Sequence, residues 1–233
     1  MNPTGLCTRP GGWSQARRTV LRMMTTVLGL VFPARCPGCG VTAEPMCAAC
    51  TATTRPAPAL MVPAGLDALS VPFAYEGVVR ELVARAKYRN RQAALGWLAH
   101  EITRALGPHA AAIDVVTWAP TTARRKRQRG FDQAELLATF IASELRLPVR
   151  ARLRRVGGRA QTGENRAARA EGPQFVPVRR REQLEHHPVA QRPESVLVVD
   201  DVITTGATMS RAARELRNGG AHRVLGVAAA RKP

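Results

Sequence analysis

The sequence predicts an α/β protein with a central, mostly parallel sheet flanked by helices and a small cysteine-rich unit before it. Residues 196–199 form a continuous run of β-favouring apolar residues, as expected for a strand buried on both faces of a parallel sheet. Strand-like runs and helical patterns alternate between residues 69 and 230, which is typical of parallel sheets. Four cysteines in two C-x2-C pairs indicate a compact metal-binding unit near the N-terminal end.

The composition limits the size and the partners of this fold. At 233 residues, the chain fits one α/β domain and a small appendage. Apolar residues make up 45% of the chain but aromatic residues only 4%, so the core must consist mainly of Ala, Val and Leu. The net charge of +18 attracts polyanions such as nucleic acid or phosphorylated metabolites. A generally basic surface without a clustered site is the alternative interpretation.

Residues 1–32 are predicted to form an N-terminal tail and a short amphipathic helix. Their longest apolar run, 27–32, is far shorter than the ~20 residues that a membrane span needs. No small-x-small cleavage site follows it, so we expect a cytoplasmic protein and no exported one. Met23 and Met24 are alternative start positions to Met1.

Residues 33–55 are predicted to form a zinc finger. Cys36 and Cys39 make the first C-x2-C pair, and Cys47 and Cys50 make the second. Two such pairs can present four thiolates to one tetrahedral Zn²⁺ ion, leaving no open position, so this zinc would be structural. Disulfides are one alternative, although they conflict with a chain that has no export signal. Iron–sulfur ligation is the other.

Residues 56–68 contain three prolines and a glycine among small residues, which predicts a linker before a larger domain over 69–233. A strand is predicted at 69–75, followed by helical apolar stripes over 78–86 and 95–102. Lys87 lies in the basic break between these two helices. That break is either a phosphate contact or a solvated loop.

A second core strand is predicted at 113–118, followed by a turn, a cationic loop and a helix over 134–145. Open α/β sheets bind ligands at the carboxyl ends of their strands, so this loop is expected to face phosphate. A solvated basic face is the alternative. The turn consists of Ala119, Pro120, Thr121 and Thr122, and the cations of the loop are Arg124, Arg125, Lys126, Arg127 and Arg129.

The second half of the chain contains two polar excursions. Residues 150–169 are rich in Arg and broken by Gly, which is typical of a lid over an anionic substrate or of a disordered loop. Residues 175–178 read as a short edge strand because Pro177 cannot donate to a sheet. After the polar residues 179–195 and the run 196–199, a last strand is predicted at 224–230.

The strand at 196–199 leads into an acidic pair, Asp200 and Asp201, then a small hydroxylated loop and a helix. Backbone N–H groups at such a helix N-terminus favour an anion, and the carboxylates suit the vicinal hydroxyls of a ribose or a hydrated Mg²⁺ ion. Simple helix capping is the alternative. Neither G-x-x-x-x-G-K-[ST] nor G-x-G-x-x-G occurs here. The loop consists of Thr204, Thr205, Gly206, Ala207 and Thr208.

This stretch resembles the phosphoribosyl diphosphate (PRPP) signature of type I phosphoribosyltransferases, and the whole chain resembles the ComF family. That family joins a four-cysteine zinc finger to a phosphoribosyltransferase-like domain. The resemblance implies the type I phosphoribosyltransferase fold and a link to DNA uptake and processing, with a competence helicase as a partner. The matching segments are the four cysteines, residues 75–78, 87–88, 120–133, 153–155, 161–163, Arg169, Phe175 and the acidic pair with its loop.

The resemblance also implies roles for the site residues. The loop 204–208 would hold the 5′-phosphate of PRPP, and Asp200 and Asp201 would hold its ribose hydroxyls. The turn 119–122, the cations of 124–129 and Lys87 would face diphosphate together with Mg²⁺.

Two departures from the family pattern affect the chemistry. Asp132 stands where the family often has Asn, which adds a carboxylate to a site expected to hold diphosphate. Thr204 stands where purine-salvage relatives have an aspartate, so no general base is evident there. The sequence therefore predicts a PRPP-dependent transferase whose acceptor and oligomeric state are open. The alternative is a non-catalytic adaptor that binds single-stranded DNA through the same fold.

Overall fold

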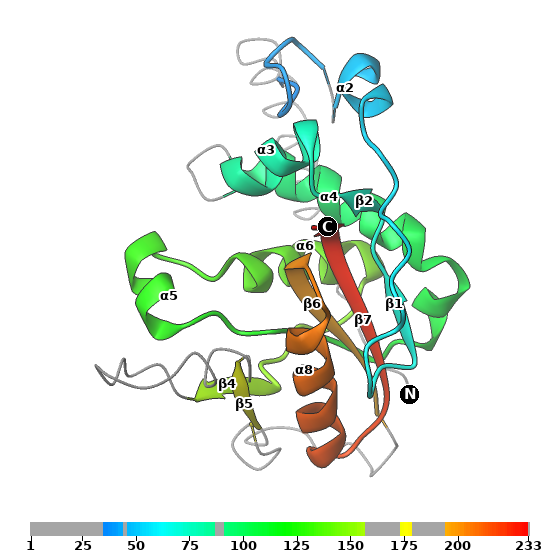
Figure 1. The fold of residues 1–233 in the computed structure, drawn as a ribbon, viewed down its shortest axis with the longest axis vertical. Coiled ribbons are helices and arrows are strands. Elements are labelled where there is room, and N and C mark those ends of the chain that lie inside the picture. Colours follow the sequence, from blue (N-terminus) through cyan, green and yellow to red (C-terminus); the bar gives the residue numbers. More distant parts are fainter. Residues whose placement is uncertain (1–34, 44–45, 87–90, 157–172, 179–193, 233) are drawn as a thin grey trace, which may run out of the picture.

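A computed structural model describes residues 35–43, 46–86, 91–156, 173–178 and 194–232 of the chain. Its centre is a parallel sheet in which the strands follow the order β1, β7, β6, β3, with β2 also paired to β7 (Figure 1). Every pairing in this sheet is parallel. The strands are β1 (Ala68–Ser70), β2 (Phe73–Ala74), β3 (Val115–Trp118), β6 (Glu194–Ile203) and β7 (Ala221–Arg231). The predicted α/β class is thereby confirmed.

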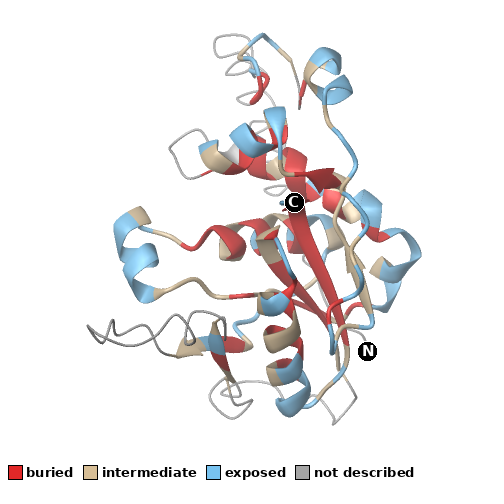
Figure 2. Cartoon of the chain, viewed as in Figure 1, coloured by how far each residue is buried: buried red, intermediate tan, exposed pale blue. Residues whose placement is uncertain are grey.

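Helices cover both faces of this sheet, as expected when all its strands are buried (Figure 2). The helices α3, α4 and α6 pack on one face, and α8 packs on the other beside a small antiparallel hairpin, β4 with β5. Their bounds are α2 (Ala48–Ala52), α3 (Gly77–Arg85), α4 (Arg91–Leu106), the 3-10 helix η1 (Gly107–Ala112), α5 (Ala123–Arg129), α6 (Gln133–Leu145), β4 (Leu153–Val156), β5 (Gln174–Pro177) and α8 (Ala207–Asn218).

The run 196–199 explains how β6 becomes the central strand. Its side chains alternate between the faces: Leu197 and Val199 join the core under α4 and α6, whereas Val196 and Val198 join the core under α8. All four side chains are at most 1% exposed. Burial on both faces anchors the end of β6, where the acidic pair lies.

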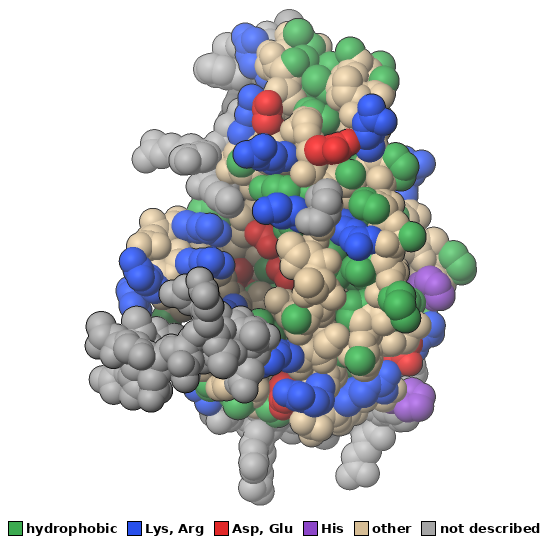
Figure 3. Space-filling view, in the orientation of Figure 1, with side chains coloured by type: hydrophobic (Ala, Val, Ile, Leu, Met, Phe, Trp, Pro, Cys, Tyr) green, Lys and Arg blue, Asp and Glu red, His purple; other side chains and the backbone are tan. Residues whose placement is uncertain are grey.

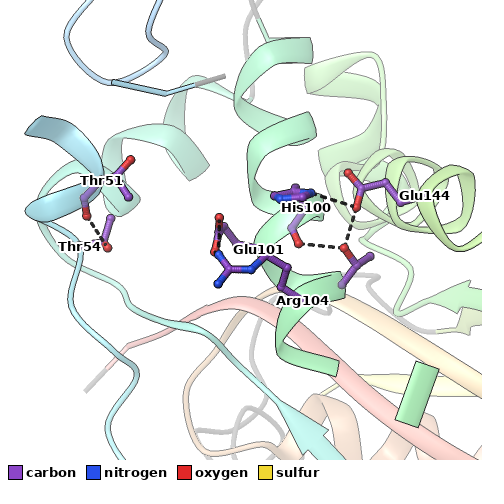
Figure 4. Close-up of polar contacts among 7 residues, drawn as sticks. Thr51, Thr54, His100, Glu101, Arg104 and Glu144 are labelled. Atoms are coloured by element: carbon purple, nitrogen blue, oxygen red, sulfur yellow. Dashed lines mark hydrogen bonds and ion pairs between the residues drawn. The ribbon is translucent and has the colours of Figure 1, made fainter. Parts of the chain in front are cut away.

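Polar contacts between α4 and α6 lie on the surface and play a minor part in the fold (Figure 4). The hydroxyl of Thr103 donates to Oε2 of Glu144 at 2.6 Å, and His100 lies 3.7 Å from the same carboxylate. On α4 itself, Arg104 pairs with Glu101 at 3.0 Å. Such exposed pairs contribute only about 0–1 kcal/mol each, so the apolar interface holds these helices together.

Residues 56–67 lie along the edge of the sheet. The amide of Ala57 donates to the carbonyl of Pro72 at 3.1 Å, and Oδ2 of Asp67 accepts from the amide of Val224 at 2.7 Å. Asp67 also pairs with Arg217 of α8 at 2.8 Å. These contacts fix the path of the segment, while the division into finger, linker and larger domain stays a prediction.

Within the described residues, no helix is both long and apolar enough to cross a membrane.

Candidate functional site

A cavity of about 400 Å³ opens at the carboxyl edge of the sheet, where open α/β sheets bind their ligands. Figure 3 shows acidic side chains in a hollow there, with Lys and Arg side chains on its rim. The described residues that line the cavity are Tyr75, Val83, Ala119, Pro120, Thr121, Arg125, Arg129, Asp132, Gln133, Ala134, Arg155, Asp200, Asp201, Val202, Thr208 and Lys232. This lining brings together the carboxyl ends of β3, β6 and β7 with side chains from α3, α5, α6, β4 and α8.

The acidic pair forms one wall of the cavity near the end of β6. An oxygen of Asp200 accepts from the amide of Asp201 at 2.8 Å, and an oxygen of Asp201 accepts from the amide of Val202 at 2.8 Å. Burial, followed by the negative charge of Asp201, raises the pKa of Asp200 well above its ordinary value. The raised pKa favours a proton on Asp200, and neutral hydroxyl groups of a sugar suit such a site.

The loop between β6 and α8 only partly reaches the cavity. Thr208, in the first turn of α8, lines it, whereas Thr204, Thr205, Gly206 and Ala207 are not among the lining residues. Thr204 and Thr205 are exposed, so their hydroxyls stay accessible beside the cavity. Gly206 has φ +81°, and a Cβ there would lie 2.6 Å from Cγ of Pro63. Only glycine fits this backbone at such a close approach.

The cationic segment 124–129 is helix α5, although the sequence predicted a loop. The hydroxyl of Thr122 accepts from the amide of Arg125 at 3.2 Å, and Gly130 ends the helix with φ +79°. One turn apart, Arg125 and Arg129 line the cavity. Arg124, Lys126 and Arg127 are exposed and do not line it.

Lys126 instead forms an ion pair with Glu135 of α6 at 2.8 Å. The hydrogen bond to that carboxylate raises the pKa of Lys126. Lys87 lies outside the described residues, so its predicted role has no structural counterpart here.

Ala119, Pro120 and Thr121 of the turn after β3 line the cavity, and Thr122 caps α5. The amide of Ala119 donates to the carbonyl of Val199 at 2.9 Å, which continues the sheet. The amide of Thr121 donates to Oδ2 of Asp132 at 2.7 Å. The backbone of this turn is thus largely occupied by the protein itself.

Arg155 is a cavity residue that the site predicted from the sequence did not include. Its half-buried guanidinium comes from β4, lies 5.9 Å from the centre of the Phe175 ring and makes one long hydrogen bond of 3.5 Å to the carbonyl of Pro120. Burial, followed by the charge of Arg125, lowers the pKa of Arg155. No ion pair of Arg155 occurs among the described residues, so its positive charge is available to a bound anion.

A period-2 pattern would have found Arg155. Leu153 is buried and Arg154 is exposed, so Arg155 shares the inward face of β4 with Leu153. No comparable signal exists for Tyr75 and Lys232, which reach the cavity from opposite ends of the domain. Their proximity is created by the hydrogen bond of the Tyr75 amide to the carbonyl of Arg231 at 2.6 Å.

The four cysteines converge as their spacing predicted. Their Sγ atoms all lie within 4.8 Å of one another, and those of Cys39 and Cys47 are 3.6 Å apart. Tetrahedral zinc with Zn–S bonds of 2.3 Å would place sulfur atoms about 3.8 Å apart, so the cluster fits such an ion. Burial opposes ionisation of Cys36, but backbone hydrogen bonds led by that of Cys47 outweigh it and lower its pKa to about 6.

The cysteine cluster rests directly on α3. The guanidinium of Arg85 donates to the carbonyls of Pro37 and Gly38 at 2.7 and 2.9 Å. A Cβ at Gly38 would lie 2.8 Å from both Sγ of Cys50 and Cγ2 of Val78, so no side chain fits between the cluster and the helix. Val83 of the same helix lines the cavity, so α3 contributes side chains to both the cavity and the support of the cysteine cluster.

The cavity thus joins an acidic pair, a threonine in the first turn of α8 and three guanidinium groups at the carboxyl edge of a parallel sheet. Residues 133–233 match the family model described as Phosphoribosyl transferase domain. This match covers α6, the hairpin, β6, α8 and β7. The chain therefore contains a phosphoribosyltransferase-like domain.

The solved structures that are similar to this chain include the following three. Glutamine PRPP amidotransferase from B. subtilis, complexed with ADP and GMP, is 23% identical at a TM-score of 0.37, over 64% of this chain and 26% of that one. A hypothetical protein from Neisseria gonorrhoeae with bound ppGpp is 16% identical at a TM-score of 0.33, and the match covers 69% of this chain and 70% of that one. Purine phosphoribosyltransferase from Pyrococcus horikoshii Ot3 is 16% identical at a TM-score of 0.31, and the match covers 63% of this chain and 71% of that one.

The chain thus spans about a quarter of the length of the amidotransferase. Comparison with curated proteins found no match.

Proposed function

We propose that the protein binds PRPP in the cavity at the carboxyl edge of the sheet. The observation that carries this proposal is that one cavity unites the carboxylates of Asp200 and Asp201 with three guanidinium groups and Thr208. PRPP carries a vicinal diol between two phosphate-bearing ends, and the carboxylates, Thr208 and the guanidinium groups of the cavity would match these three parts. The guanidinium groups are those of Arg125, Arg129 and Arg155.

Each part of the ligand has a proposed partner. The acidic pair would accept hydrogen bonds from the ribose 2′ and 3′ hydroxyls, and the loop 204–208 would bind the 5′-phosphate at the N-terminus of α8. The guanidinium groups would face diphosphate. Mg²⁺, held by oxygens of the acidic pair and of the ligand, would neutralise charge and orient the diphosphate.

If the protein is a transferase, a nitrogen nucleophile displaces diphosphate from C1 of the ribose. Negative charge then grows on the leaving diphosphate, and the three guanidinium groups that line the cavity would stabilise it. No carboxylate stands at Thr204 to take a proton from the acceptor. Binding is therefore better supported than turnover, and the acceptor stays open.

We also propose that the protein belongs to the ComF family, resides in the cytoplasm and serves DNA uptake or processing with a helicase partner. The cysteine cluster seated on a phosphoribosyltransferase-like domain supports this assignment. In that role the cluster would hold a structural zinc ion, because four thiolates leave no open coordination position.

Isothermal titration with PRPP and Mg²⁺ tests the main proposal. We expect saturable binding by the wild type and a loss of at least about 100-fold in Asp200→Ala/Asp201→Ala, since both partners of the diol disappear. Arg124→Gln is the matched control, because this exposed side chain does not line the cavity. Absence of PRPP binding by the wild type, or unchanged binding by the double variant, would refute the proposal.

A second candidate function is binding of single-stranded DNA without catalysis. It is favoured by Arg124 and Arg127, which are exposed on α5 and do not line the cavity. Electrophoretic mobility shift across a salt series tests it, because binding through phosphates weakens steeply as salt rises. Weak binding that does not change with salt would contradict this role.

A further inference from the structure

Asp132 is a buried carboxylate in the wall of the proposed diphosphate end. Its side chain is 3% exposed and lines the cavity. One oxygen accepts from the amide of Thr121 at 2.7 Å, and the other accepts from the amide of Ala134 at 3.1 Å. Both oxygens are thus engaged by backbone N–H groups, so the carboxylate has a role within the protein.

The position of Asp132 in the chain shows what this carboxylate connects. Thr121 lies just before α5 and Asp132 lies just after it, so their hydrogen bond closes the base of the excursion 121–132 that carries α5 (Figure 1). The second hydrogen bond of Asp132 fixes this base to the N-terminus of α6. The base of the excursion is therefore anchored to a helix that is itself buried in the core.

Helix α5 has little else to hold it. None of its residues is buried, and it protrudes from the body of the protein (Figure 2). Besides its ends, the described contact to the body is the exposed ion pair of Lys126 with Glu135, a type worth about 0–1 kcal/mol. The direction in which Arg125 and Arg129 project is consequently set at the base of the excursion.

Three of the four residues in the turn 119–122 have no free backbone N–H group for a ligand. The amide of Ala119 belongs to the sheet, Pro120 has no N–H group, and the amide of Thr121 is taken by Asp132. Diphosphate in this cavity would therefore depend on side-chain cations and on their placement more than on the backbone of the turn.

Resting on the proposed binding of PRPP, we infer that Asp132 is a positioning residue for diphosphate. Its carboxylate clasps the two ends of the α5 excursion, and thereby holds Arg125 and Arg129 over the diphosphate end of the cavity. It does this without contacting the ligand. The carboxylate is compatible with an anion site because two N–H groups donate to it, and because burial raises the pKa of Asp132 and so disfavours its charged form.

Titration with two probes separates this role from a purely structural one. PRPP with Mg²⁺ engages both ends of the cavity, whereas ribose 5-phosphate lacks the diphosphate. We expect Asp132→Ala to weaken PRPP binding roughly tenfold while ribose 5-phosphate binding changes less than about twofold. Asp132→Asn keeps a carbonyl acceptor for one of the two amides and should recover most of the PRPP affinity.

Ala138→Gly is the control for stability, because it weakens the buried middle of α6 and leaves the hydrogen bonds of Asp132 in place. It should lower the melting temperature and leave both affinities unchanged. Equal losses for the two probes in Asp132→Ala, or no loss for either, would overturn the inference. If Asp132→Ala does not fold, Asp132→Asn is compared with the wild type. The ratio of PRPP affinity to ribose 5-phosphate affinity should then be the same in both proteins, and a lower ratio in Asp132→Asn would overturn the inference.

A double-mutant cycle tests whether Asp132 acts through Arg125. Arg125→Gln should cost clearly less PRPP affinity in the Asp132→Ala background than in the wild type, because the arginine is already displaced there. Equal costs in the two backgrounds would contradict a positioning role. Failure of the proposed function would be recognised in the wild type itself, which would then bind neither PRPP nor ribose 5-phosphate. In that case the inference about Asp132 would also be wrong.

Discussion

The two ends of the cavity are built in opposite ways. At the end of β6, the acidic pair and the loop lie between a strand buried on both faces and helix α8, whose Met209, Ala212 and Ala213 are fully buried. At the other end, the cations come from α5, none of whose residues is buried, and from Arg155 of a two-stranded hairpin. The end proposed to bind the sugar and 5′-phosphate is thus preformed, whereas the end proposed to bind diphosphate depends on a few polar contacts.

Because of this difference, substitutions at the two ends should differ in their effects on stability and ligand affinity. In the β6 and α8 region, stability and ligand affinity are coupled, because the site residues continue directly from the core. At the α5 and β4 end, a substitution should change affinity with little effect on the free energy of unfolding.

Gly206→Ala should have the largest effect on stability. A Cβ at this position would lie 2.6 Å from Cγ of Pro63, and φ is +81°. We expect the free energy of unfolding to fall by about 2–4 kcal/mol, through backbone strain and overpacking. Chemical denaturation measures it, and Pro63→Ala in the same background should recover the part caused by the contact. Full stability of Gly206→Ala would show that the loop is not preformed.

Arg155→Gln should reduce PRPP affinity about tenfold with little change in melting temperature. The guanidinium has one long hydrogen bond of 3.5 Å within the described protein, so a bound anion would be its main partner. Arg154→Gln is the matched control, because its side chain is exposed on the opposite face of the same strand. Titration with PRPP and with ribose 5-phosphate should show a loss for PRPP alone, and equal losses from the two variants would contradict the assignment.

The sequence predicted the features that depend on local patterns. The run 196–199 identified the central strand, and the spacing of the cysteines predicted a cluster that the structure closes to within 4.8 Å. The prediction from the sequence was wrong for α5, because a run of charged residues has no apolar stripe that would indicate a helix. The only sequence signals for this helix are its capping residues, Thr122 and Gly130.

The parts of the site that were missed depend on contacts between distant residues. The structural role of Asp132 rests on a hydrogen bond to Thr121, and a local pattern shows only a carboxylate beside cations. Tyr75 and Lys232 meet because β2 and β7 are neighbours in the sheet. Strand order is a tertiary property, so local patterns could place Asp200, Asp201 and Thr208 near the end of the central strand but could not predict the whole lining.

Asp200→Asn should stabilise the protein at neutral pH while weakening PRPP binding. Burial and the charge of Asp201 raise the pKa of Asp200, so the folded protein holds this proton more tightly than the unfolded chain. As pH rises above the ordinary aspartate value of about 3.9, the unfolded chain releases the proton first and stability falls until the folded pKa is passed. The Asn variant lacks this loss.

The melting temperatures of the two proteins should therefore agree near pH 3.5 and diverge above it, with the variant higher by about 2–4 °C at pH 7.5. Arg155→Gln should show no such gain, because its effect on the protein is on affinity. A variant that is less stable than the wild type at pH 7.5 would mean that Asp200 is stabilising when charged. The preformed end of the cavity would then owe its geometry to the acidic pair itself, and the core strand beneath it would be insufficient to hold the site.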